Sequence, residues 1–141
     1  MADKLWRRRT TIPLYGPSFH VWIGSTEALR AYVKGYPLNR DDVEKYGHAR
    51  GQAFSLQAPH RQTQPWHVVW LESFDSTMKD ISDLAHECTH AASDVLENAG
   101  IPVRAENNEA LAYLVSWMLH TALRMLWKEG KYKLIGKAAH K

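Results

Sequence analysis

The chain has 141 residues, about the length of one globular domain, and 45% of them are hydrophobic while 23% are charged. This composition excludes a disordered polyelectrolyte, and no apolar run approaches the roughly 18 residues that a membrane-spanning helix needs. The formal net charge of +3 permits contact with nucleic acid, but no motif indicates it. We therefore expect a single domain over residues 1–141 with no membrane partner, and the pattern gives no oligomeric state.

The cysteine content and the start of the chain bear on the compartment. The single cysteine, Cys88, excludes an intrachain disulfide and the paired cysteines of a zinc ribbon. The basic residues 7–9 are not followed by the apolar segment of a secretory signal. We therefore expect a cytoplasmic setting, with Cys88 as a small buried hydrophobe.

A hairpin followed by a short helix is predicted at the start of the chain. Residues 19–23 are rich in aromatic and β-branched side chains, and a turn at 15–18 separates them from an extended segment at 5–14. Ser25 is placed to cap a helix over residues 26–34.

Two further strands are predicted in the middle of the chain, after a possible turn at residues 41–46. Residues 52–58 and 66–73 are extended in character and are joined by a loop at 59–65. Residues 68–71 are apolar on both faces, which places the second of these strands inside the sheet.

The second half of the chain changes to a helical period. Apolar residues recur every three or four positions over 81–96, Ser76 or Thr77 can cap this helix, and Gly100 follows its end. A second long helix is expected from about 105 to 130. Strands followed by helices predict an α+β fold, with about four strands in an antiparallel or mixed sheet.

A His-Glu-x-x-His motif lies inside the first long helix, at His86, Glu87 and His90. Histidines four positions apart project from one helix face about one turn apart, where both rings can bind the same ion, and Glu87 can reach a metal-bound water. The alternative is a solvated polar stripe without a metal, formed by Asp83, His86, Glu87, His90, Asp94 and Glu97. The helical context favours a zinc site.

A catalytic zinc ion usually has three protein ligands and one open position. Glu109 is the leading candidate for the third, because an antiparallel second helix would bring it back toward the histidines. Glu106, one turn earlier, is the main rival. His120 lies about 16 Å further along the helix than Glu109, too far to share an ion with it.

Residues 85–94, followed by Asn108-Glu109, resemble the active-site helix and the glutamate helix of the gluzincins, the zinc metallopeptidases that include thermolysin-like enzymes and aminopeptidases. The resemblance covers about residues 81–120 and implies a minimal zincin-like fold. By this resemblance the Zn²⁺ ligands are His86, His90 and Glu109, and the general base is Glu87. The short chain is similar to small metallopeptidases encoded by phages and prophages.

Other positions are compared with the same family. Where thermolysin-like enzymes have an aspartate one turn after the ligand glutamate, this chain has Tyr113. Asp94 matches an acidic residue one turn beyond the second histidine and is a candidate hydrogen-bond partner for it, with an exposed carboxylate as the alternative. The candidates for stabilising the transition state are Tyr113, Tyr132, His67 and His120.

The expected reaction is hydrolysis of a peptide bond in a protein or peptide substrate, with a zinc-activated water and Glu87 as base. In this superfamily the substrate usually adds as a strand to an exposed sheet edge, for which the candidates are Ala53, Phe54 and Ser55. The alternative is a zinc-containing binding or regulatory module without strong activity. Glu87 favours the enzyme, because a structural zinc site has no use for a base. A DNA-associated protease is a third hypothesis, but the chain lacks the cysteines of the usual zinc ribbon.

Overall fold

The computed structural model describes residues 4–35, 45–47, 49–57 and 64–132. In chain order the elements are β1 (Trp6–Thr11), β2 (Ser18–Ile23), α1 (Thr26–Val33), β3 (Gly51–Gln57), β4 (Pro65–Leu71), α3 (Met78–Asn98), the 3-10 helix η1 (Ala105–Asn107) and α4 (Asn108–Lys128). The predicted α+β order of strands followed by two long helices is confirmed. Most of the predicted turn at 41–46 and of the loop at 59–65 lies outside the described residues.

The sheet has four strands in the order β1-β2-β4-β3. The β1–β2 and β3–β4 pairs are antiparallel, whereas β2 and β4 run parallel, so the sheet is mixed. The prediction that the strand near residues 66–73 lies inside the sheet is confirmed, because β4 pairs on both sides. The strand predicted near residues 52–58 is β3, and it forms one edge.

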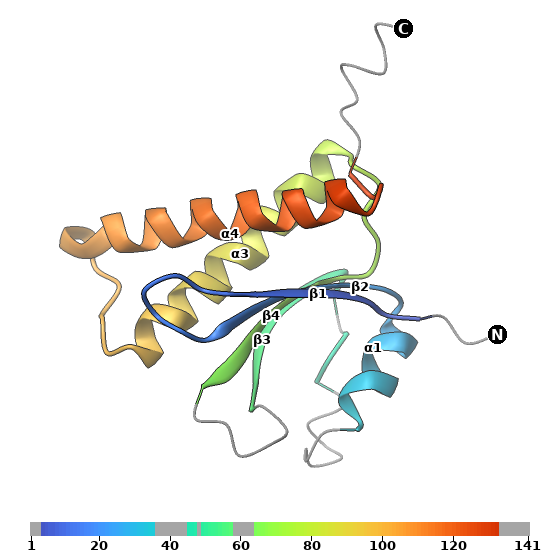
Figure 1. The fold of residues 1–141 in the computed structure, drawn as a ribbon, viewed down its shortest axis with the longest axis horizontal. Helices are drawn as coiled ribbons and strands as arrows, with labels where there is room; N and C mark the ends of the chain where they lie inside the picture. The colour runs from blue at the N-terminus through green and yellow to red at the C-terminus, as the bar shows by residue number, and fades with distance from the viewer. Residues whose placement is uncertain (1–3, 36–44, 48, 58–63, 133–141) are drawn as a thin grey trace, which may run out of the picture.

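Helices cover both faces of this sheet (Figure 1). The long helices α3 and α4 pack together on one face, and the short α1 lies against the other. Alternate residues of β2 divide between the two layers: Phe19 and Val21 face the long helices, and Trp22 belongs to the smaller cluster beneath α1. Phe19 contacts Trp117 of α4, with ring centroids 5.8 Å apart. The helix α3 itself packs against β3 and β4.

Local signals in the sequence set the ends of these elements. The Ser25 hydroxyl accepts a hydrogen bond from the Ala28 N–H at the start of α1. Thr77 and Asp80 form a reciprocal capping box at the start of α3, and Gly100 follows its end with φ of 79°, a left-handed value that glycine adopts without strain. Within the described part of the chain, no helix combines the length and apolar character needed to cross a membrane.

Candidate metal centre

The two histidines of the motif meet at their outer ring nitrogens. His86 and His90 lie on the exposed side of α3, and their Nε2 atoms are 3.2 Å apart. Two nitrogens bound to one tetrahedral zinc ion, each at 2.0–2.1 Å, lie about 3.3 Å from one another. One neutral ring can donate a hydrogen bond to the other. The same spacing also lets both Nε2 atoms bind one cation. The pair therefore fits two of the ligand positions of a zinc site.

Glu87 lies between these histidines in sequence but is turned toward the sheet. The residue is only 9% exposed, and its carboxylate accepts a hydrogen bond from the backbone N–H of Ala53 on β3. Burial raises the pKa of Glu87 above its ordinary value, against smaller opposing effects of His86, His90 and the Ala53 N–H. A carboxylate with a raised pKa takes up a proton more readily near neutral pH, as a general base must. The burial also argues against a uniformly solvated polar stripe.

Gly51, at the start of β3, gives Glu87 room to lie against the strand. A β-carbon at this position would lie 2.8 Å from Leu71 Cδ2 and 3.4 Å from both Cγ and Oε2 of Glu87. A larger residue would therefore clash with Leu71 and crowd Glu87 where α3 packs against β3. Sequence reasoning did not single out Gly51, because its role depends on a contact between distant segments.

An open hollow of about 420 Å³ lies beside Glu87. We call it the Glu87 hollow; its described lining consists of Ala49, Arg50, Gly51, Lys79, Ser82, Asp83, His86 and Glu87. Lys79 and Asp83 form an ion pair across one helical turn, with Nζ 3.2 Å from Oδ2. Sequence reasoning missed Arg50, Lys79 and Ser82 as site residues. Ser82 and Lys79 lie one and two helical turns before His86, and this spacing was the signal that could have identified them.

Glu109 is placed at the start of α4, where the chain returns from the end of α3. It is exposed in the first turn of α4, and Glu106 is exposed in η1, where its Oε1 lies 3.9 Å from Nη1 of Arg104. Among residues 4–35, 45–47, 49–57 and 64–132, no three His, Cys, Asp or Glu side chains form a group that could hold a metal ion. The structure therefore brings the two histidines together but adds neither glutamate to them.

Asp94 and Tyr113, the candidates for supporting the metal ligands, have different surroundings. Asp94 is half-buried one turn beyond His90. Burial, with a smaller effect of Glu97, raises the pKa of Asp94, and His90 opposes this increase. The carboxylate is thus close enough to His90 to interact with its ring. Tyr113 is exposed on α4.

The four candidates for stabilising a transition state are dispersed. Tyr113 and His120 are exposed on α4, and Tyr132 packs against Phe74 and Trp127. His67 is buried in β4, where burial lowers its pKa to about 4 and neither ring nitrogen has a hydrogen-bond partner among the described residues. None of the four belongs to the described lining of the Glu87 hollow.

Cys88 is fully buried on the core side of α3. Burial, assisted by the nearby charge of Glu87, raises the pKa of its thiol to about 12. The thiol is therefore neutral near pH 7, and the side chain acts as a small buried hydrophobe, as predicted. Only the thiolate form is a good nucleophile or metal ligand.

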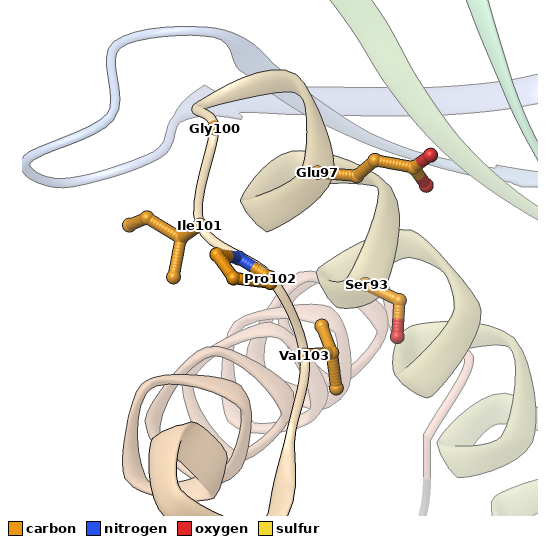
Figure 2. Close-up of a pocket in the computed structure, with 6 residues that line it drawn as sticks. All are labelled: Ser93, Glu97, Gly100, Ile101, Pro102 and Val103. Atoms are coloured by element: carbon orange, nitrogen blue, oxygen red, sulfur yellow. The ribbon is translucent and has the colours of Figure 1, made fainter.

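A second hollow of about 600 Å³ lies at the far end of α3. Figure 2 shows Ser93 and Glu97 from the last turns of the helix, and the segment from Gly100 to Val103 where the chain leaves it. Ser93 and Glu97 continue the helix face of His86 and His90, because they follow His86 by seven and eleven positions. Apolar side chains of Pro102 and Val103 line the opposite wall.

Comparisons of the chain with protein-family models, with curated proteins and with solved structures find no match. The assignment of a function therefore depends on the geometry of the side chains described above.

Proposed function

We propose that the chain is a zinc-dependent metallopeptidase with a minimal zincin-like fold. The observation that carries the proposal is the turn of α3 in which two histidine Nε2 atoms lie 3.2 Å apart while the intervening Glu87 carboxylate is buried against an edge strand. A hydrogen-bonded histidine pair alone would not require a buried carboxylate between its members, since burial of such a group is costly.

The proposed metal ligands are His86, His90 and Glu109. The histidine spacing supports the first two, and the resemblance to the gluzincin motif supports Glu109. Because Glu109 lies exposed in the first turn of α4 and forms no group with the histidines among the described residues, binding requires the start of α4 to move toward the pair. A bound zinc ion would supply Lewis acidity, which acidifies a water molecule and polarises a carbonyl group.

Glu87 is the proposed general base. It accepts a proton from the attacking water and then passes it to the nitrogen of the leaving amine. Its raised pKa suits both transfers, because the group must gain and lose a proton within one reaction cycle. The Ala53 N–H holds the carboxylate against β3, and Glu87 belongs to the lining of the Glu87 hollow.

The edge strand β3 is the proposed binding surface for the substrate. One side of β3 pairs with β4, and its other side faces away from the sheet. An extended peptide can add there through main-chain hydrogen bonds with the outer edge of β3, beside Phe54 and Ser55 and next to Ala53, whose N–H is already held by Glu87. Its scissile bond would then lie near α3, which packs against β3. Substrates of this class are proteins or peptides with an unstructured segment.

Metal content and peptide cleavage test the proposal together. The purified protein should hold about one zinc ion per chain, measured by mass spectrometry of the metal, and should cleave members of a broad peptide pool. Glu87→Gln should keep the zinc and lower cleavage by at least about a hundredfold, because an amide has nearly the same shape but cannot accept the proton. Glu27→Gln, an exposed carboxylate on α1, is the matched control and should cleave normally.

Two outcomes would contradict different parts of the proposal, the first the enzyme activity and the second the assignment of the base. Zinc binding without cleavage of any peptide would support the binding-module alternative. Cleavage that survives Glu87→Gln would assign the base to another residue.

A further inference from the structure

A second set of polar side chains lies on the sheet face opposite the long helices. His20 of β2 pairs with Arg9 of β1 in the sheet register, and its ring stacks on Trp66 of β4 with centroids 4.3 Å apart and an interplanar angle of 23°. Trp66 packs with the apolar cluster beneath α1, which also includes Trp22 of the same β2 face. These side chains are therefore separated from His86 and His90 by the thickness of the sheet.

An open hollow of about 320 Å³ lies beside these side chains, and we call it the Arg9 hollow. Its described lining consists of Arg7, Arg8, Arg9, His20 and Trp66. No carboxylate occurs in this described lining, and of its three arginines only Arg8 forms an ion pair with a described carboxylate outside it. Arg7 and Arg9 lie two positions apart in β1 and so share one face of the strand, where their like charges repel one another and an anion bound between them would relieve that repulsion.

The three arginines differ in what they contact. Arg8 forms an ion pair with Glu129 at the end of α4. Arg7 donates to the Tyr32 hydroxyl, and its guanidinium lies 4.0 Å from the centre of the Tyr32 ring. Arg9 makes no hydrogen bond or ion pair with any residue that the structure describes. Its donors are therefore available to a ligand, whereas Arg7 and Arg8 are already held in place.

His20 is the second unsatisfied group beside the Arg9 hollow. The residue is only 3% exposed, and its Nε2 atom has no hydrogen-bond partner within the described ranges. Burial, followed by the charges of Arg9, Arg7 and His67, lowers the pKa of His20 to about 3. A buried imidazole nitrogen without a partner costs free energy, so a native protein retains one where something compensates for it.

We propose that the Arg9 hollow binds a small phosphate-bearing anion, with Arg9 as the principal ligand residue and His20 beside it. A guanidinium presents its N–H groups as a planar fork that fits two oxygens of a phosphate. A phosphate has further oxygens for Arg7 or for the His20 ring, whereas a single carboxylate has only two oxygens in one plane. The class of ligand includes inorganic phosphate and monophosphate esters such as a nucleoside monophosphate.

Calorimetric titration of the full chain tests this site. Inorganic phosphate and adenosine monophosphate are each titrated in about 150 mM sodium chloride, which screens general attraction between exposed charges. At least one of them should bind saturably. Arg9→Gln should weaken this binding by at least about tenfold, because it removes a charge-assisted pair of hydrogen bonds. Arg124→Gln, which removes an exposed arginine on α4, is the matched control and should weaken it less than about twofold.

Three further measurements make the result decisive. Circular dichroism checks that Arg9→Gln folds, and Arg9→Lys should recover only part of the affinity because lysine lacks the fork. The imidazole ¹⁵N resonances of His20 should shift on titration in the unmodified protein. Glu87→Gln should bind phosphate normally, so failure of the peptidase proposal would leave this one standing.

The proposal is overturned if neither phosphate ligand binds, or if Arg9→Gln and Arg124→Gln weaken binding equally. Single-stranded oligothymidylate, which carries only phosphodiesters along its backbone, is titrated as a separate arm. Binding of this oligonucleotide that depends on Arg9, without binding of the small ligands, would also overturn the proposal and would assign the surface to nucleic acid.

Discussion

Glu87 and its flanking histidines belong to one helical turn, but they meet different surroundings. The histidines project into solvent on α3, while Glu87 lies over Gly51 and Ala53 of the edge strand. The spacing of the motif predicts that His86 and His90 share a face, since helix geometry alone decides this. It does not predict the burial of Glu87, which depends on where a distant strand packs.

The choice between the two glutamates near α4 gives a prediction for single residues. Glu109→Gln should weaken zinc binding by at least about tenfold, because it removes a charged ligand, whereas Glu106→Gln should leave it nearly unchanged. Glu106 is exposed and its ion pair with Arg104 is long, so its loss should also cost less than about 1 kcal/mol of stability. Competition with a chromogenic zinc chelator measures both affinities. A stronger effect at Glu106 would reverse the assignment.

The helix α3 carries the candidate site, and the start of this helix is fixed by a capping box. Asp80 is buried there, and its Oδ2 accepts from the Asp75 N–H at 2.6 Å and from the Thr77 N–H at 3.4 Å. Burial alone would raise the pKa of Asp80, but these hydrogen bonds, with a smaller contribution from Arg50, lower it. The ionised form is therefore favoured in the folded protein, and the helix begins at a defined residue.

This linkage predicts how the cap responds to pH. A carboxyl whose pKa is lowered by folding stabilises the protein above its unfolded pKa, near 4, and this stabilisation is lost as the pH falls through the folded value. At pH 7, Asp80→Asn should lower the free energy of unfolding by about 1 kcal/mol. The difference from the unmodified protein should shrink as the pH falls below about 4. Urea denaturation across this pH range provides the measurement.

Thr77→Ala is the control for the cap, because it removes the hydroxyl that accepts from the Asp80 N–H without removing a titrating group. Its cost should also be about 1 kcal/mol near neutral pH. A deficit for Asp80→Asn that stays constant down to the lowest pH would show that the charge of Asp80 does not contribute to the cap.

At the scale of the whole molecule, local signals made much of the architecture predictable. Ser25, Thr77 and Gly100 occupy the cap positions expected of them, and the hairpin of β1 and β2 forms around its predicted turn. These features depend on residues close together in sequence. The parallel pairing of β2 with β4 joins segments separated by a helix and β3, and no short pattern encodes it.

The candidate sites follow the same division. The histidine pair was predictable from an interval of four residues, whereas the Glu87 hollow requires α3 to pack on β3. Arg9 and His20 become neighbours only through the register of β1 with β2, and Trp66 joins them through β4. The expected antiparallel return of α4 predicts Glu109 as a ligand, but that return alone does not bring its side chain to the histidines among the described residues.

Zinc binding should also stabilise the fold as a whole, because the proposed ligands come from two helices that unfolding would separate. A ligand that binds only the folded state at about 100 times its dissociation constant adds about 2.7 kcal/mol of stability, which corresponds to a rise in Tm of roughly 8 °C for a domain of this size. Chelator-treated protein should show this rise by differential scanning calorimetry when zinc is restored. His90→Ala should abolish it, and His120→Ala, which removes an exposed histidine from α4, should retain it. An equal rise in Tm in both variants would place the zinc elsewhere, because His90 is a member of the histidine pair on α3 and His120 is not.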